Sequence, residues 1–105
     1  MSEEKPISEL YRSVAKTWVA LESAASLLED SKSAFLAQRM LALGDIAVSK
    51  AEMLVKASPE WTDYLTKMTK AREEANLAKV KMEYIRMQYG ERQSSEATAR
   101  AEMKL

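Results

Sequence analysis

Apolar residues recur in alternating steps of three and four along two long stretches of the chain. In the first stretch the repeat comprises Tyr11, Val14, Trp18, Leu21, Ala25, Leu28, Lys32 and Phe35, the lysine being its one charged member. In the second it comprises Trp61, Tyr64, Met68, Ala71, Ala75, Ala78, Met82, Ile85 and Tyr89. Such steps follow one face of an α-helix, whereas a strand would alternate in steps of two. We therefore predict two helices that pack along these faces, and we call each face a seam.

Helix-breaking residues mark where the first helix begins and ends. Pro6 followed by Ser8 predicts a start with Ser8 as the N-cap. Neither proline nor glycine then occurs before Gly44. The first helix is therefore predicted over about 8–43.

A second start follows at Ser58, Pro59 and Glu60. Serine caps the helix, proline suits the first helical position, and an acid is favourable in the first turn. No breaker follows until Gly90, so the second helix is predicted over 59–89 at least, followed by a helical or frayed tail over 90–105.

A short helix is predicted in the connection, over about 49–57. Ser49 with Glu52 three residues later fits a capping box. We expect the apolar side of this helix, with Met53 and Leu54, to cover the end of the hairpin.

The two seams match by size when they are laid antiparallel. The predicted facing pairs are Tyr11–Tyr89, Val14–Ile85, Trp18–Met82, Leu21–Ala78, Ala25–Ala75, Leu28–Ala71, Lys32–Met68 and Phe35–Tyr64. Leu21 and Leu28 each face an alanine, so a large side chain lies opposite a small one where close packing requires it. Near the connection we expect Arg39 to lie over Trp61 as a cation–π pair.

Charges beside the seams favour the same register. Arg72, Lys79 and Arg86 recur every seven residues beside the second seam, and Glu22 and Glu29 stand beside the first. The register predicts the ion pairs Glu22–Lys79 and Glu29–Arg72. Exposed pairs contribute only ~0.2–1 kcal/mol each, so they select the register more than they stabilise the fold.

Composition supports one all-α domain over 1–105. With the two seams, it predicts a coiled-coil-like antiparallel helical hairpin. We expect this hairpin to assemble into a helical bundle oligomer. The 105 residues are 47% hydrophobic and 30% charged, with only two glycines and two prolines. The hydrophobic share is typical of a globular chain, and β-rich domains need more turn residues.

Several chemistries are disfavoured by residue content. The chain has no cysteine and no histidine, which removes Ser-His, Cys-His and zinc-water machineries. Two acidic pairs, Glu60 with Asp63 and Glu73 with Glu74, are the nearest candidates for a carboxylate metal site, and a solvated face explains both better. We expect a protein that is not an enzyme and that has no metal or cofactor.

A basic column could follow a phosphate backbone. It comprises Arg72, Lys79, Arg86 and Arg100. The formal net charge of zero, from 16 basic and 16 acidic residues, argues against a protein that coats duplex nucleic acid. Pairing with the acids beside the first seam is the favoured interpretation of the column.

A second apolar stripe lies on the second helix, away from its seam. It comprises Leu77, Val80, Tyr84 and Met87. We predict that it is the interface of a homo-oligomer, most simply a two-fold dimer that makes a four-helix bundle. The alternative is that the N-terminal segment or the short helix folds over it.

The tail keeps a helix-forming composition, although its seam degrades to Arg92, Glu96, Ala99 and Met103. One interpretation is a frayed chain end. The other is a partner-docking segment that uses Arg92, Glu96, Arg100 and Met103.

Localisation is predicted from two absences. The N-terminal residues 2–6 are followed by no apolar stretch of the kind that a signal peptide needs. No run approaches the ~20 apolar residues of a membrane span. We expect a cytoplasmic protein without membrane contact.

The runs VSKAEMLVKASPEW (48–61) and QSSEATARAEM (93–103) resemble a family of small uncharacterised proteins of bacteriophages and prophages. Genes of this family lie near early replication and recombination functions. The resemblance implies a phage-encoded accessory protein in the cytoplasm of a bacterial host, and it transfers no activity and no functional residues.

The sequence favours one function and leaves one alternative. The first is a non-enzymatic adaptor or modulator that binds a host or phage protein. The alternative is a nucleic-acid-binding accessory factor of a phage recombination or replication module. Its weakness is that exposed aromatic residues spaced for base stacking are lacking.

Overall fold

The computed structural model describes residues 6–103, which form helices α1 (Ile7–Asp30), α2 (Lys32–Ala42), α3 (Val48–Lys56) and α4 (Pro59–Met103). These described residues contain no strand. The N-terminal segment considered for a signal peptide lies mostly outside the described residues, as do the last two residues of the tail.

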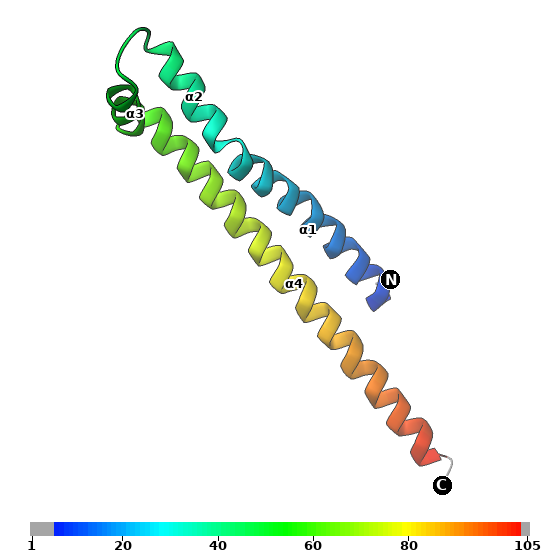
Figure 1. Cartoon of the computed structure of the whole chain (residues 1–105). Coiled ribbons are helices and arrows are strands. Elements are labelled where there is room, and N and C mark those ends of the chain that lie inside the picture. The colour runs from blue at the N-terminus through cyan, green and yellow to red at the C-terminus, as the bar shows by residue number, and fades with distance from the viewer. Residues whose placement is uncertain (1–5, 104–105) are drawn as a thin grey trace.

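The helices form an elongated antiparallel hairpin (Figure 1). α1 and α2 follow one another along α4, and α3 lies at the connection, where it contacts α2 and α4. The principal extents are 83 × 31 × 16 Å. The predicted all-α fold, a long helical hairpin with a short helix at its connection, is confirmed.

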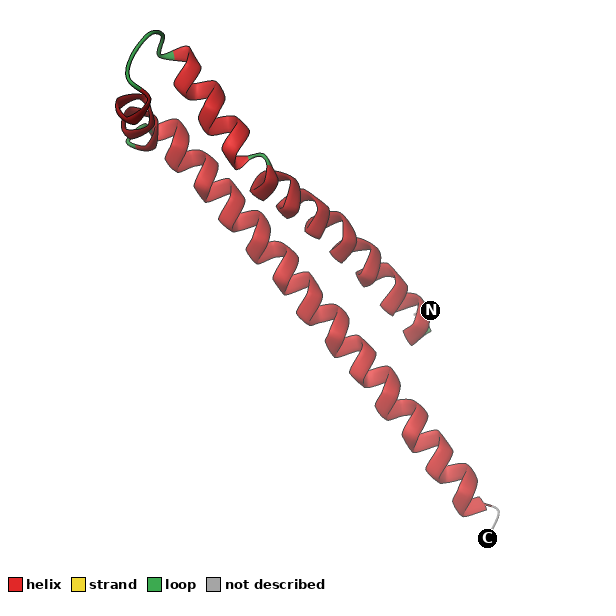
Figure 2. Ribbon diagram, viewed as in Figure 1, coloured by secondary structure: helices red, strands yellow, loops and turns green. Residues whose placement is uncertain are grey.

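The first arm is interrupted at Ser31, where an unbroken helix was predicted (Figure 2). The Ser31 N–H donates to the Leu27 carbonyl, and the Phe35 N–H donates to the Ser31 carbonyl, both at 2.9 Å. The break is therefore one residue long, and the arm continues. Aspartate and serine have a lower helix propensity than alanine or leucine, and three of them stand at positions 30, 31 and 33, so a break can occur here without glycine or proline.

The arm also begins and ends slightly differently from the prediction. The N-cap is Pro6, whose carbonyl accepts from the N–H groups of Glu9 and Leu10, so the assignment of Ser8 as the cap was wrong. α2 ends at Ala42, and Gly44 follows with φ +87°, a left-handed conformation that glycine adopts without steric cost.

Ser58 connects the end of α3 to the start of α4. Its Oγ accepts a hydrogen bond from the Trp61 N–H at 3.3 Å and donates to the Val55 carbonyl at 2.5 Å. The predicted cap of the second helix is confirmed. It also explains how two helices can meet with almost no loop between them.

The predicted capping box at the start of α3 was wrong. The N-cap is Ala47 and makes no side-chain capping bond. Glu52 instead forms an ion pair with Lys56 one turn later, at 2.7 Å. A glutamate can satisfy a neighbouring lysine as readily as a backbone N–H, so the sequence pattern does not decide between them.

α3 also packs through a different face from the one predicted. Ala51 and Val55 are buried, whereas Met53 and Leu54 are exposed. Ala51 and Val55 are one turn apart and share a face, and Met53 lies about 200° around the helix from each. Small side chains let the short helix approach the hairpin closely, which the larger Met53 would prevent.

Burial along the two seams agrees with the predicted register. Val14, Ala25, Trp61, Ala75 and Ile85 are buried, and the other seam residues are half-buried apart from Lys32 and Tyr89. The rings of Phe35 and Tyr64 stack at 4.4 Å between centroids, as the register requires. At the other end, Tyr11 and Tyr89 line the same surface hollow.

The contacts of Trp61 differ from the prediction in one respect. The Nζ of Lys32 lies 5.7 Å from the Trp61 ring centroid, whereas Arg39 pairs with Glu60 at 3.6 Å. The predicted cation–π pair of Arg39 was therefore wrong. Glu60 attracts the arginine to the edge of the helix, and the long lysine stem reaches the ring instead.

The middle of the hairpin, which we call its waist, holds Ala25 and Ala75, and neither has any exposed surface. Replacing Ala75 with leucine is expected to overpack this layer and to lower the free energy of unfolding by ~1–3 kcal/mol. Urea unfolding at fixed concentration measures the change. The matched control is Ala24→Leu, the same change at the exposed position beside Ala25 on α1, which should change it by less than ~0.5 kcal/mol. Equal midpoints for the two variants would contradict close helix contact at the waist.

Candidate interaction surface

The apolar stripe of α4 is exposed to solvent along its whole length. The exposed fractions are 69% for Leu77, 63% for Val80, 60% for Tyr84 and 63% for Met87. Val80 lies about 140° around the helix from Ala75 and about 160° from Met82, at 100° per residue. The stripe therefore faces almost directly away from α1, which leaves α4 with one packed face and one open apolar face.

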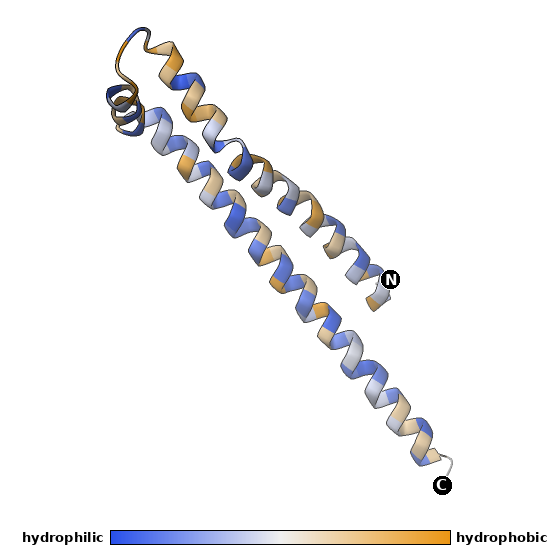
Figure 3. Ribbon diagram, viewed as in Figure 1, coloured by the Kyte–Doolittle hydropathy of each residue, from blue (hydrophilic) through white to orange (hydrophobic). Residues whose placement is uncertain are grey.

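No helix of the chain covers this stripe in the part that the structure describes. α3 sits at the connection, far along α4 from Leu77, so the alternative in which the short helix folds over the stripe is contradicted (Figure 1). Figure 3 shows orange positions scattered along α4 on a largely hydrophilic helix. The stripe is thus the apolar part of an otherwise polar outer surface.

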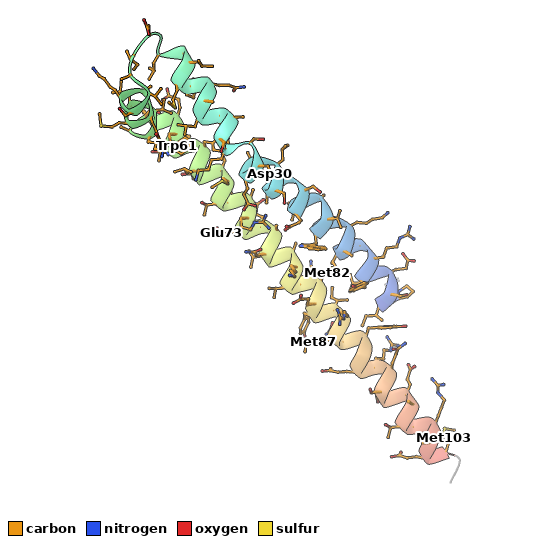
Figure 4. All side chains as sticks on the ribbon, viewed as in Figure 1. Asp30, Trp61, Glu73, Met82, Met87 and Met103 are labelled. Atoms are coloured by element: carbon orange, nitrogen blue, oxygen red, sulfur yellow. The ribbon has the colours of Figure 1, made fainter. Side chains whose placement is uncertain are left out.

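α4 continues well beyond the start of α1. Pro6 and Ser8 line a hollow together with Tyr89, Arg92, Gln93 and Glu96, so the first arm begins at this level of α4. Every residue from Tyr89 to Met103 is exposed, and Figure 4 shows Met103 far from the other arm. We call the residues after Glu96, 97–103, the overhang. It is helical, so the frayed conformation predicted as one alternative is not what the structure describes for these residues.

The predicted docking residues lie along this end of α4. Arg92 and Arg100 both approach Glu96, at 3.7 and 4.0 Å, one helical turn away on each side. Met103 is 86% exposed. Exposed pairs of this kind are worth a few tenths of a kcal/mol, so a partner can displace them at little cost.

Arg72 holds two glutamates of α1 at once. Its Nη1 donates to Glu22 Oε2 at 2.6 Å, while Nη2 and Nε donate to the two carboxylate oxygens of Glu29 at 2.6 and 2.8 Å. The Glu29–Arg72 pair was predicted. The Glu22–Lys79 pair was wrong, because the guanidinium presents several donors and can serve both carboxylates.

This cluster makes the contact between the arms sensitive to acid. The hydrogen bonds from Arg72 lower the pKa of Glu29 below its ordinary value and raise the pKa of Arg72. A carboxyl with a lowered pKa in the folded state stabilises the fold at pH values above its unfolded pKa. That stabilisation is lost as the pH falls through the lowered value.

The rest of the basic column is not neutralised by α1. Among the described residues, no carboxylate lies within 4.0 Å of Lys79 or Arg86, whereas Arg72 and Arg100 are paired. Both unpaired side chains are exposed. Fewer side chains of the basic column are therefore paired with acids of α1 than the sequence predicted.

A second group of exposed apolar residues lies around the connection, and the sequence-based prediction missed it. Its members are Leu41, Leu43, Val48, Met53 and Leu54. Leu41 of α2 and Leu43 at its end lie off the three-and-four steps of the seam, and this spacing could have indicated their exposure. For Met53 and Leu54 the packing face of α3 was assigned wrongly.

Chemistry at this surface is limited by its residues. No group of three acidic residues in the described chain could hold a metal ion. Among those same residues no helix is both long and apolar enough to cross a membrane. The fold and the surface thus define an all-α helical hairpin with an open apolar face and a protruding helix end.

Comparison with known proteins adds no family to this description. No protein-family model, no curated protein and no solved structure matches the chain.

Proposed function

We propose that the chain is a non-enzymatic accessory protein of bacteriophage or prophage type that acts by binding other proteins as an oligomeric helical adaptor or modulator. The observation that carries the proposal is the open outer face of α4, where four apolar side chains are each at least 60% exposed. The proposed place of action is the cytoplasm of a bacterial host. The phage assignment rests on the sequence resemblance alone.

Self-association through the stripe is the first part of the proposal. A hairpin of 105 residues buries few side chains fully, so additional burial between chains is energetically favourable. Contiguous exposed apolar residues rimmed by charges are typical of protein–protein contacts. Leu77 and Val80 are followed by Tyr84, whose ring adds a large contact area at a low cost in side-chain entropy.

Partner docking through the overhang is the second part. A helix end that has no partner in the described part of its own hairpin offers a preformed surface, because binding does not require the segment to fold. Met103 offers an adaptable apolar side chain, and Arg92 and Arg100 offer donors for acidic or polar groups of a host or phage protein.

Deleting residues 94–105 is expected to abolish partner capture and leave the hairpin folded. The protein is used as bait in bacterial host lysate, and captured proteins are compared with those of the full chain. Circular dichroism is the control, since the truncated chain should lose only the helix of the deleted residues. A second control, Met53→Ala at the opposite end of the hairpin, should keep capture intact.

The same partners captured by the truncated chain would contradict docking through the overhang. A loss of capture that accompanies loss of the whole helical signal would contradict the independence of the tail from the fold.

A nucleic-acid function is the second candidate, because Lys79 and Arg86 have no described carboxylate within ion-pair distance. With Arg100 they would follow a phosphate backbone on the same side of α4. Binding of a labelled single-stranded oligonucleotide that weakens steeply with salt, and that Lys79→Gln with Arg86→Gln reduces, would favour this candidate. Capture that survives nuclease treatment favours protein binding.

A further inference from the structure

A hollow lies between the two arms where α1 begins. It has a volume of about 310 Å³ and is lined by Ser8 and Tyr11 of α1 and by Arg86 and Tyr89 of α4. This volume is at the lower end of the range for small-ligand sites. Tyr11 is half-buried and Tyr89 is 39% exposed. The two tyrosines belong to different helices, so the fold brings to one site two rings that no spacing along a single helix would join.

Arg86 supplies the positive charge of this hollow, and the first arm does not neutralise it. Glu22 and Glu29 both pair with Arg72, further along the hairpin. Steps of seven residues from these acids toward the start of α1 reach Ala15 and Ser8, which carry no charge. The acids that flank the first seam therefore end before the hollow begins.

Tyr11 also lines a second hollow, which has a volume of about 420 Å³ and lies on α1. The other lining residues are Arg12, Ala15, Lys16 and Val19. Arg12 and Lys16 are exposed, and no carboxylate of the described chain lies within ion-pair distance of either. Tyr11 thus belongs to two hollows, and a basic side chain lines each of them.

Positive charge exceeds negative charge along this side of the hairpin. Its basic side chains are Arg12, Lys16, Lys79 and Arg86. Two carboxylates lie near them. Glu9 lines a shallow hollow with Arg12 and Lys16, and Glu83 stands one helical turn from both Lys79 and Arg86. Four cations against two carboxylates leave a local excess that the net charge of the whole chain does not reveal.

We propose that this end of the hairpin binds single-stranded nucleic acid, with bases against the rings of Tyr11 and Tyr89 and phosphates on Arg86 and the neighbouring cations. The proposal rests on the second candidate function above and gives that function its site. It does not depend on partner docking through the overhang. Every base has an aromatic face that can stack on a tyrosine, so binding requires no particular base sequence. The guanidinium of Arg86 offers several donors to one phosphate.

The spacing of the cations suits a single strand. Lys79 and Arg86 lie seven residues apart, which is ~10.5 Å along α4. Phosphates of one stacked strand recur every ~3.4 Å, so the two cations are about three phosphates apart. In a duplex the faces of the bases are stacked on one another and cannot reach a tyrosine. The hollow therefore favours unpaired bases.

Binding of a labelled thymidine strand of about ten nucleotides to the full-length protein tests the proposal, with fluorescence anisotropy as the measurement. Tyr89→Leu is expected to weaken binding ~5-fold or more, whereas Tyr89→Phe should retain it, because stacking needs the ring and not the hydroxyl. The matched control is Tyr84→Leu on the outer face of α4, where Tyr84 is 60% exposed, and it should leave the affinity unchanged. Circular dichroism checks that each variant keeps its helices.

Arg86→Gln separates the contribution of phosphate from that of the base. It should weaken binding and reduce the slope of log affinity against log salt by ~0.7, the value for one phosphate contact on a single strand. Tyr89→Leu should leave this slope unchanged. A uridine strand measured in parallel shows whether RNA is bound as well as DNA, and binding of either strand with these variant effects supports the proposal.

An abasic strand of the same length distinguishes stacking from charge. It should bind more weakly than the thymidine strand, and Tyr89→Leu should not weaken it further. Equal affinity for the two strands would overturn stacking at the hollow. No binding of any strand at low salt would overturn the proposal and leave the adaptor function intact, since the 94–105 deletion tests that function separately. Loss of protein capture by Tyr89→Leu without any strand binding would assign the hollow to a protein partner.

Discussion

Replacing Trp61 with alanine is expected to lower the free energy of unfolding by ~3–5 kcal/mol, the largest loss from any single side chain of the hairpin. Trp61 is only 6% exposed, and its ring stacks with Phe35 and Tyr64 at centroid distances of 6.2 and 6.4 Å. Lys32 lies over the same ring. Removal of the Trp61 side chain leaves a cavity where the two arms and the connection meet.

Urea unfolding at one fixed protein concentration measures this loss, because the proposed self-association would make apparent stability depend on concentration. The matched control is Met53→Ala on α3, at the same end of the molecule but 63% exposed, with an expected change below ~0.5 kcal/mol. A Trp61→Ala variant that unfolds at the same midpoint as this control would show that the aromatic cluster does not hold the arms together.

Replacing Leu77 with lysine is expected to raise the dissociation constant of the proposed dimer by a factor of ~10² or more. The two-fold axis places each substitution in the interface twice, and each copy loses the ~1.5–3 kcal/mol of a buried leucine. Every 1.4 kcal/mol corresponds to a tenfold change in affinity. Sedimentation equilibrium over a concentration series measures the constant.

The control for this variant is Leu27→Lys on α1. Leu27 and Leu77 are equally exposed, at 67% and 69%, so the two changes remove the same apolar surface from different helices. Leu27 lies outside the stripe, and its replacement should leave the dissociation constant unchanged. An equal weakening by both variants would mean that charge, and not the α4 face, governs association.

The hairpin and its register could be predicted from the sequence because long-range packing here follows local periodicity. The stacked rings of Phe35 and Tyr64 and the contact of Arg72 with Glu29 are both consequences of seams with fixed three-and-four steps. In a helical pair the period sets the contacting face, and size matching sets the offset. The start of α4 could be predicted for a similar reason, because Ser58 and Pro59 act through local backbone geometry.

The details that failed depend on choices between near-equal partners. Glu22 pairs with Arg72 and not with Lys79, because the guanidinium of Arg72 reaches two carboxylates. Arg39 pairs with Glu60 and does not lie over Trp61. Each competition is decided by side-chain reach at a scale below one helical turn. The break at Ser31 was missed because only glycine and proline were treated as helix breakers.

The candidate surface shows a similar division. The sequence pattern located the stripe on α4, since an apolar face that a hairpin leaves open is visible as a second three-and-four repeat. The exposed residues around the connection depended on how α3 packs. Nine residues provide too little periodicity to choose between the face with Ala51 and the face with Met53.

The central claim is that the open face of α4 is an interface between two copies of the chain, and the mass in solution tests it most directly. Light scattering on the purified full-length protein at micromolar concentration should return twice the chain mass of 11.8 kDa. The value should fall toward 11.8 kDa for Leu77→Lys and stay unchanged for Leu27→Lys. A mass of 11.8 kDa for the unmodified chain across the micromolar range would contradict the account.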